Sequence, residues 1–506
     1  MSSRAPRWGL VLAGILVLAA VLRLWKLGER SLWLDEVFTL RHVDGDLGHV
    51  LDRCAKEDVA PLYPLLAWAW SKAFGLSEAG LRSLPALLGV LTVPVVWAIG
   101  ARLGGPRAAA FAALLAATSP FLVWHAQDAR PYALLILLSA VALLGFVRAL
   151  EEGARRRWLV VWALASAGAV ATHYDAVFPF AAEAAWLLVA LRARGVAPVL
   201  AACVPAVVTG LALLPLALDQ SGGELGGGGL GGNAGEGTAN DGGGGFLGIA
   251  DPAALARRIL YVPGQFLAGY QPPLQLAAVL VAGLLVLAAV VVGLRSIPRE
   301  RLERLAPVAA VGAVVVVVPI LLTVTGFDQV YTRFQSPAFV PLVVVLAAGL
   351  AWAARRAALA IAGGLVLFGV LVVVASAEDP KFGHQDWRGA LDAAGPAGAV
   401  VLSATRAYEV VPVMRPDWEY WQEGTRVSEI ASLALPPQHR EIGREPEPPR
   451  PPTPAPPAGF RVVERRDGAT FTLVRYRAAE PAVVGEAELR RLALGPMGTI
   501  VWEARR

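Results

Sequence analysis

The run PYALLILLSAVALLGFVRA, residues 131–149, decides the fold of this chain. Its only charged residue, Arg148, lies next to its C-terminal end. A helix of about 20 mainly apolar residues crosses the roughly 30 Å hydrocarbon core of a lipid bilayer. The run therefore predicts a membrane-spanning helix.

Similar apolar runs recur along the first three quarters of the chain. Hydrophobic residues make up 56% of the 506 residues and charged residues 17%, whereas a soluble domain has about 25% charged residues. This composition excludes a disordered chain, and two cysteines exclude a disulfide scaffold. We expect an all-α polytopic membrane protein with about eleven transmembrane helices, at 9–25, 81–102, 107–124, 131–149, 158–173, 176–191, 197–218, 274–294, 306–324, 336–353 and 357–375.

The arginines set the expected orientation, because Lys and Arg gather in cytoplasmic loops. Arg4 and Arg7 precede the first run, which we expect to be a retained helix because no small-x-small cleavage site precedes Arg23. Alternation then places the N-terminus inside and the C-terminus outside a plasma (inner) membrane. The other arginines on the inner side are Arg102, Arg107, Arg148, Arg155, Arg156, Arg157, Arg192, Arg194, Arg295, Arg299, Arg301, Arg304, Arg355 and Arg356.

The net charge of +5, from 45 basic and 40 acidic residues, follows from this topology and predicts no nucleic-acid partner. Counting the short apolar segment 61–75 as a span would move most arginine loops outside. We therefore expect it to be a juxtamembrane helix within the outer loop 26–80, with Trp68 and Trp70 at the level of the lipid headgroups.

The composition predicts two domains, a transmembrane domain over 1–375 and a small extracytoplasmic α/β domain over 376–506. In the second domain, 399–402 and 470–476 predict strands and 386–394 predicts a short helix. The Pro-rich segment 445–457 is either a spacer or an extended protein ligand.

The outer loop 219–257 contains a Gly-rich tract at 222–245. This tract lacks the Lys-Ser/Thr of a phosphate loop and follows no strand. It is either a flexible linker or a mobile loop over a substrate cleft.

Asp35 and Glu36 follow Ser-Leu-Trp-Leu just outside the first span. Acids in this position are common at helix N-termini, where the helix dipole favours them. The alternative is catalytic, because an ionised carboxylate in an outer cleft could accept a proton from a hydroxyl.

Other polar side chains gather at predicted outer turns, where a charge is costly unless it faces a cavity or a partner. Asp128 and Arg130 are either an interfacial ion pair or part of an anion site, because the arginine fork fits phosphate oxygens. Arg333 departs from the inside bias of the arginines and is either an interfacial anchor or a ligand of a lipid phosphate. Gln127, Tyr132, His173 and Tyr174 lie at the same turns. No second histidine stands at metal spacing from His173, so we expect no His-rich zinc site.

Five segments, taken in order, resemble the motifs of bacterial membrane glycosyltransferases of the GT-C fold. The similarity is to the family 39 type, related to protein O-mannosyltransferases and aminoarabinose lipid A transferases. It extends over nearly all of 8–400, and Asp386-Trp-Arg388 resembles the start of the outer C-terminal domain of this family. The segments are Ser31-Leu-Trp-Leu-Asp-Glu-Val-Phe-Thr39, Ala60-Pro-Leu-Tyr63, Phe74-Gly-Leu-Ser-Glu-Ala-Gly-Leu-Arg-Ser-Leu-Pro85, His125-Ala-Gln-Asp-Ala-Arg-Pro-Tyr132 and Thr172-His-Tyr174.

The resemblance implies an enzyme that transfers a sugar, with inversion, from a polyprenyl-phosphate donor to an acceptor hydroxyl on the outer face. Asp35 matches the catalytic acid of the family and would be the general base, oriented by Glu36. Arg130 and Arg333 would hold the donor phosphate. The remaining substrate-binding residues would be Gln127, Asp128, Tyr132, His173, Tyr174 and Tyr63.

The expected partners are the lipid-linked sugar donor, membrane lipids and an acceptor, which could be a protein, a glycan or a lipid. The sequence implies no certain cofactor and leaves a divalent-cation requirement open. One departure affects the donor site. Relatives often carry a basic or polar residue before the Pro-Pro-Leu element, whereas here the sequence is Val59-Ala60-Pro61-Leu62 and a phosphate-contacting Lys is absent at that place.

Two alternatives from other classes remain at this point. A transporter or flippase of lipid-linked sugars would place polar residues at the bilayer midplane, whereas the predicted spans are nearly free of charge there. A non-catalytic membrane protein could instead bind a partner through its outer domain, which carries Trp387, Trp418, Tyr420 and Trp421.

Overall fold

The computed structural model describes residues 8–57, 59–225, 252–324, 330–395, 397–404, 406–436, 450–495 and 498–504. These residues form two compact units. The helical unit contains the described residues up to Leu27 and those from His42 to Ala375. The sheet unit contains Gly28–Arg41 and the described residues from Ser376 onwards. The functional division of the chain at residue 375 stays a prediction.

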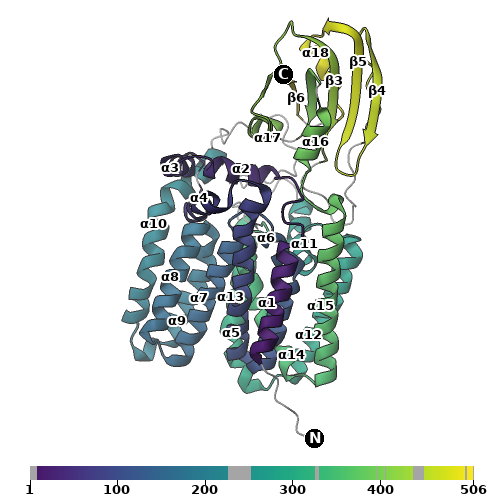
Figure 1. Ribbon diagram of the computed structural model, residues 1–506. Coiled ribbons are helices and arrows are strands. Elements are labelled where there is room, and N and C mark those ends of the chain that lie inside the picture. The colour runs from purple at the N-terminus through teal and green to yellow at the C-terminus, as the bar shows by residue number, and fades with distance from the viewer. Residues whose placement is uncertain are drawn as a thin grey trace. The chain divides into compact units, whose positions relative to one another are not determined.

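The helical unit is a bundle whose long helices run side by side (Figure 1). Three 3₁₀ turns, η1 (Tyr174–Ala176), η2 (Arg192–Arg194) and η3 (Ser336–Ala338), interrupt it. Its helices are α1 (Trp8–Leu24), α3 (Leu47–Lys56), α4 (Leu62–Phe74), α5 (Glu78–Thr118), α6 (Pro120–Ala126), α7 (Tyr132–Glu152), α8 (Arg156–Thr172), α9 (Val177–Ala190), α10 (Ala197–Leu225), α11 (Pro252–Ala268), α12 (Gln275–Ser296), α13 (Arg299–Val324), α14 (Phe339–Trp352) and most of α15 (Arg355–Glu378).

Among the described residues, 6 helices are long and apolar enough to cross a membrane. Trp8–Leu24 and Ser336–Trp352 are shorter apolar helices. The chain is therefore a helical polytopic membrane protein with about six to eight apolar spans, fewer than the eleven expected. The qualifying helices are α5, α7, α10 (over Ala197–Leu218), α12, α13 (over Arg299–Thr323) and α15.

The difference in the number of spans has two physical sources. The runs expected at 81–102 and 107–124 fall largely in α5, which holds 41 residues and is kinked at Gly105, with φ of 77°. Pro106 follows the kink and cannot donate a backbone hydrogen bond. The runs at 158–173 and 176–191 form α8 and α9, with 17 and 14 residues.

Small residues let the helices approach closely, as is common in membrane bundles. A Cβ atom on Gly145 of α7 would lie 2.8 Å from the backbone nitrogen of Trp162 in α8. A Cβ atom on Gly293 of α12 would lie 3.2 Å from the Cα atom of Gly349 in α14. These glycines therefore set the spacing of two helix pairs.

The segment expected as a juxtamembrane helix, 61–75, forms α4 (Leu62–Phe74). Its indole groups bind within the protein. Trp68 Nε1 donates to the carbonyl of Gly45 at 3.0 Å, and Trp70 Nε1 donates to Ser83 Oγ at 2.8 Å. The indole hydrogens therefore have protein partners, and the headgroup-level position stays a prediction.

The sheet unit contains a mixed six-stranded sheet of order β2-β6-β1-β3-β5-β4. Strands β1 and β3 pair in parallel, and the other neighbours are antiparallel. The predicted C-terminal domain with strands and short helices is thus confirmed as a mixed β-sheet domain. Its elements are α2 (Leu34–Val43, whose last two residues belong to the helical unit), η4 (Pro380–Phe382), α16 (Trp387–Ala394), β1 (Ala399–Ser403), α17 (Ala407–Met414), β2 (Trp418–Tyr420), β3 (Arg426–Ala434), β4 (Phe460–Asp467), β5 (Thr472–Val483), α18 (Glu486–Arg490) and β6 (Thr499–Ala504).

The described part of the Pro-rich segment lies on this sheet. Arg465 Nη2 donates to the carbonyl of Pro451 at 2.9 Å, and the Tyr476 hydroxyl donates to the carbonyl of Pro454 at 3.2 Å. Residues 445–449 and 226–251, which include most of the Gly-rich tract, lie outside the described residues.

Candidate functional site

The predicted site residues fall in both units, and each group is described within its own unit. Asp35 and Glu36 belong to the sheet unit. The others, Tyr63, Gln127, Asp128, Arg130, Tyr132, His173, Tyr174 and Arg333, belong to the helical unit.

Asp35 and Glu36 occupy the first turn of α2. The Glu36 side chain has no exposed surface, and its Oε2 accepts from the backbone nitrogen of Trp33 at 3.4 Å. This contact is the reciprocal half of a capping box, in which the third helical residue bonds back to the N-cap. Along 31–37, Asp35 is the one residue that is not buried. Glu36 thus stabilises the start of the helix, and Asp35 is partly exposed.

His125 is the centre of an aromatic and polar cluster in the helical unit. It is 2% exposed, and its Nε2 lies 3.2 Å from the Tyr270 hydroxyl. Its ring contacts Phe121 and Tyr132, with centroids 4.7 and 5.1 Å away. Burial, followed by the positive charge of Arg333, lowers the pKa of His125 to about 3. The imidazole is therefore neutral at physiological pH, and the cations of this cluster are arginines.

Two arginines flank Tyr331. The guanidinium carbon of Arg258 lies 4.8 Å from the ring centroid, and that of Arg333 lies 5.5 Å from it. Arg333 also lies 5.3 Å from the ring of Phe334. Arg258 Nη2 also donates to the carbonyl of Val330 at 3.1 Å. The planar guanidinium fork fits phosphate oxygens with two parallel hydrogen bonds, so each arginine is a candidate ligand of an anion.

Two further predicted residues border this cluster. His173 lies between Tyr132 and Phe334, with ring centroids 5.8 and 4.9 Å away. Its Nδ1 lies 3.2 Å from Asp175 Oδ2. Asp128 is 2% exposed, and its charge acts on Tyr270. The structure therefore brings Asp128, Tyr132, His173 and Arg333 to one region of the helical unit.

The remaining predicted residues are placed less specifically. The Gln127 amide donates to three carbonyls at the end of α1, those of Leu22, Arg23 and Trp25, at 3.0–3.2 Å. This contact caps a helix. Tyr63 is 2% exposed on α4. Arg130 and Tyr174 are partly exposed at the turns before α7 and after α8.

Three residues of this region were not predicted from the sequence. Gln335 and Ser336 have no exposed surface, and none of their side-chain polar atoms has a hydrogen-bond partner. A buried polar group without a partner costs about 1–3 kcal/mol, so we add both residues to the candidate site. The third is Arg258. Its signal was available, because Arg257-Arg258 sits at the edge of an expected outer loop, against the inside bias.

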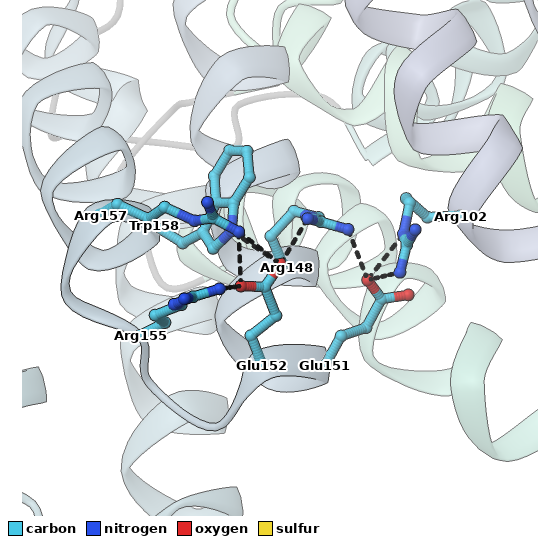
Figure 2. Close-up of polar contacts among 7 residues, drawn as sticks. All are labelled: Arg102, Arg148, Glu151, Glu152, Arg155, Arg157 and Trp158. Atoms are coloured by element: carbon cyan, nitrogen blue, oxygen red, sulfur yellow. Dashed lines mark hydrogen bonds and ion pairs between the residues drawn. The ribbon is translucent and has the colours of Figure 1, made fainter.

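A different charged group lies at the other end of α7. Glu152 accepts from Arg155, Arg157 and the indole of Trp158 at 2.8–3.2 Å, and it also pairs with Arg148 (Figure 2). Glu151 accepts from Arg102 Nε at 2.8 Å. This Arg–Glu network joins α5, α7 and α8. Over the described residues, no group of three or more His, Cys, Asp or Glu side chains could hold a metal ion.

Comparison with solved structures identifies the fold. ArnT from Cupriavidus metallidurans in the apo state is 13% identical, with a TM-score of 0.53 over 97% of this chain and 99% of that chain. The same protein bound to undecaprenyl phosphate gives a TM-score of 0.49 at 13% identity, over 93% and 98% of the chains. The Pmt1-Pmt2 protein O-mannosyltransferase complex of S. cerevisiae, bound to its sugar donor, is 18% identical with a TM-score of 0.34 over 43% of this chain. The chain spans about a third of the matched yeast chain (33%).

The apo ArnT match shows that the class of protein is a polytopic membrane protein of the GT-C fold with a C-terminal domain. The model of the family described as dolichyl-phosphate-mannose-protein mannosyltransferase matches residues 58–217 of this chain. The resemblance drawn from the motifs is thus confirmed. No curated protein sequence matches the chain.

Proposed function

We propose that this protein is a membrane glycosyltransferase that moves a sugar from a polyprenyl-phosphate donor to an acceptor hydroxyl. The observation that carries the proposal is the family match over 58–217, a region that contains Arg130, Tyr132 and His173. The description of that family names a dolichyl phosphate sugar, which is a lipid-linked donor of this chemical type. The arginine pair at Tyr331 supplies the charge that such a phosphate requires.

In the proposed reaction, the acceptor oxygen attacks the anomeric carbon as the bond from that carbon to the donor phosphate breaks. Asp35 takes the proton from the acceptor hydroxyl, and the polyprenyl phosphate leaves with the electron pair. Attack opposite to the leaving group inverts the anomeric centre. The partly exposed position of Asp35 in the first turn of α2 supports its role as general base, and Glu36 would orient it by stabilising this turn.

The proposed ligands of the donor phosphate are Arg333, Arg130 and, in addition, Arg258. Fixed cationic groups stabilise a leaving phosphate because they need no reorganisation as the charge develops. Tyr132, His173, Asp128, Tyr174, Tyr63, Gln127 and the unpartnered Gln335 are the proposed lining of the donor site.

We further propose that the N-terminus lies inside, the C-terminus lies outside, and the reaction takes place on the outer face of the plasma membrane. The support is the Arg–Glu network at one end of α7 and α8, since basic residues mark the cytoplasmic side. The acceptor class, whether protein, glycan or lipid, stays open within this proposal.

The test uses the purified full-length protein in detergent with a panel of synthetic polyprenyl-phosphate sugars and peptide, glycan and lipid acceptors. The expected result is equimolar free polyprenyl phosphate and glycosylated acceptor with an inverted anomeric centre. The same protein reconstituted into vesicles provides a second assay, in which movement of intact donor across the membrane without product would contradict the proposal and favour a flippase.

A further inference from the structure

The segment that carries the proposed base is part of the sheet unit. Residues Gly28–Arg41 group with the residues from Ser376 onwards, although more than 330 residues separate them in sequence. Direct contacts within this unit explain the grouping. These contacts are the basis of the inference.

The first contacts join the segment to the N-terminus of α16. The backbone nitrogen of Arg388 donates to Ser31 Oγ at 2.9 Å, and Arg388 Nη2 donates to the carbonyl of Glu29 at 2.8 Å. The rings of Trp33 and His384 stack at 4.0 Å with an interplanar angle of 6°. Each contact lies within six residues of Asp35.

The N-terminus of α16, which makes these contacts, is itself held in place within the sheet unit. Asp386 caps α16 by accepting from the backbone nitrogen of Gly389 at 2.9 Å, and it also accepts from the Thr470 hydroxyl at 3.2 Å. Thr470 lies just before β5, so the start of α16 is connected to the sheet. Trp387 has no exposed surface. The position of Arg388 is therefore set by the core of the sheet unit.

Two more contacts hold the segment on either side of Asp35. Arg30 donates to the carbonyl of Ser376. On the C-terminal side, Arg41 Nη1 lies 3.5 Å from Glu409 Oε2. The first turn of α2 is thus fixed before and after the carboxylate.

We infer that Ser31, Trp33, His384 and Arg388 are positioning residues for the Asp35 carboxylate. The C-terminal domain would then be a working part of the catalytic apparatus, because it fixes the general base. The inference rests on the proposed function. None of the four residues is assigned contact with the reacting atoms.

The expected signature is a change in kcat. A base displaced by about 1 Å can lose 100-fold in rate, and the proposed donor-binding residues belong to the helical unit. Replacing Arg388 by Ala, or Ser31 by Ala, should therefore lower kcat about tenfold and leave the KM for the donor within twofold. Ser31→Thr keeps the hydroxyl acceptor and should restore most of kcat.

The experiment compares these variants in the full-length protein with Arg426→Ala as the matched control. Arg426 is an arginine of the same unit that donates to the carbonyl of Pro481 at 2.9 Å, away from the segment. Hydrogen exchange of peptides covering 28–41 provides a second readout. The variants at Ser31 and Arg388 should lose protection there, and Arg426→Ala should not.

Each outcome of this experiment either supports or overturns the inference. Faster exchange with lower kcat and unchanged KM supports the inference. Unchanged exchange overturns it, as does faster exchange with unchanged kcat, and so does an equal loss of kcat in Arg426→Ala. A wild-type protein without transfer overturns the proposed function and with it the positioning role, a result visible before any variant is compared.

Discussion

The polar groups at the two ends of α7 differ in how completely they are paired. At its C-terminal end, both carboxylates of the Arg–Glu network are paired, because Glu151 and Glu152 accept from four arginines and an indole (Figure 2), although Arg148 Nε has no hydrogen-bond partner. At its N-terminal end, about 30 Å away for a helix of 21 residues, the buried Gln335 and Ser336 lack partners. This difference supports the proposal that substrate binds at the N-terminal end of α7 and that the C-terminal network is structural.

Between the two ends of α7, the largest expected effect on transfer is at the N-terminal end. Arg333→Ala removes a preorganised cation from the proposed phosphate site, and loss of one such donor costs about 100-fold in kcat. Initial rates with a polyprenyl-phosphate sugar measure the effect. Arg333→Lys, which keeps the charge but not the fork, should retain an intermediate rate. Full activity in Arg333→Ala would remove this arginine from the site.

Gln335→Leu tests whether the unpartnered amide binds substrate. The substitution leaves no protein group unpaired, so the melting temperature should stay the same or rise. Transfer should fall about tenfold, equivalent to one hydrogen bond of about 1.4 kcal/mol. A melting temperature that falls with no loss of kcat/KM would mark Gln335 as purely structural.

At the C-terminal end of α7, we expect an effect on stability and little effect on activity. Glu152→Gln removes the charge shared by Arg148, Arg155 and Arg157, so these like charges repel and the melting temperature should fall by a few degrees. Activity at low temperature should remain within twofold of wild type. A large loss of activity with an unchanged melting temperature would show that this network takes part in catalysis.

The smallest expected effect is on the melting temperature and concerns a carboxylate of the sheet unit that is paired with two arginines. Burial raises the pKa of Glu429, but hydrogen bonds from Arg475 and Arg477 outweigh burial, and the net pKa is lowered. A lowered folded pKa contributes stability above the unfolded value of about 4.3, and this stability is lost as the pH falls through the folded pKa. Glu429→Gln should therefore lower the melting temperature slightly at pH 7 and by less at pH 3.5. A larger difference at the acidic pH would contradict this assignment.

Much of the fold follows from the sequence because apolar runs and strand alternation are local signals. The run at 131–149 lies within α7, 399–402 lies within β1, and 386–394 matches α16 with one residue of difference. The number of spans differs from the eleven expected in part because the runs at 81–102 and 107–124 lie largely in one helix, α5, on either side of its kink at Gly105. The run expected at 176–191 forms α9, which holds 14 residues and is too short to be counted as a span.

The candidate site was predicted in part. Polar residues at turns between spans indicated Asp128, Tyr132, His173 and Arg333, which the structure brings to one region. The sequence could not show that the Gln127 amide caps α1, because that contact joins residues more than 100 positions apart. For the same reason, the link from Ser31 to Arg388 has no local signal. Asp35 as the general base stays a prediction.

The most direct test of the account is the transfer rate of Asp35→Asn, measured beside wild type with a polyprenyl-phosphate sugar as donor. The substitution keeps the size of the side chain and removes its ability to accept a proton. We predict a fall in kcat of at least 100-fold, within the range typical for loss of a general base, with the melting temperature unchanged. Transfer at the wild-type rate in Asp35→Asn would contradict the account.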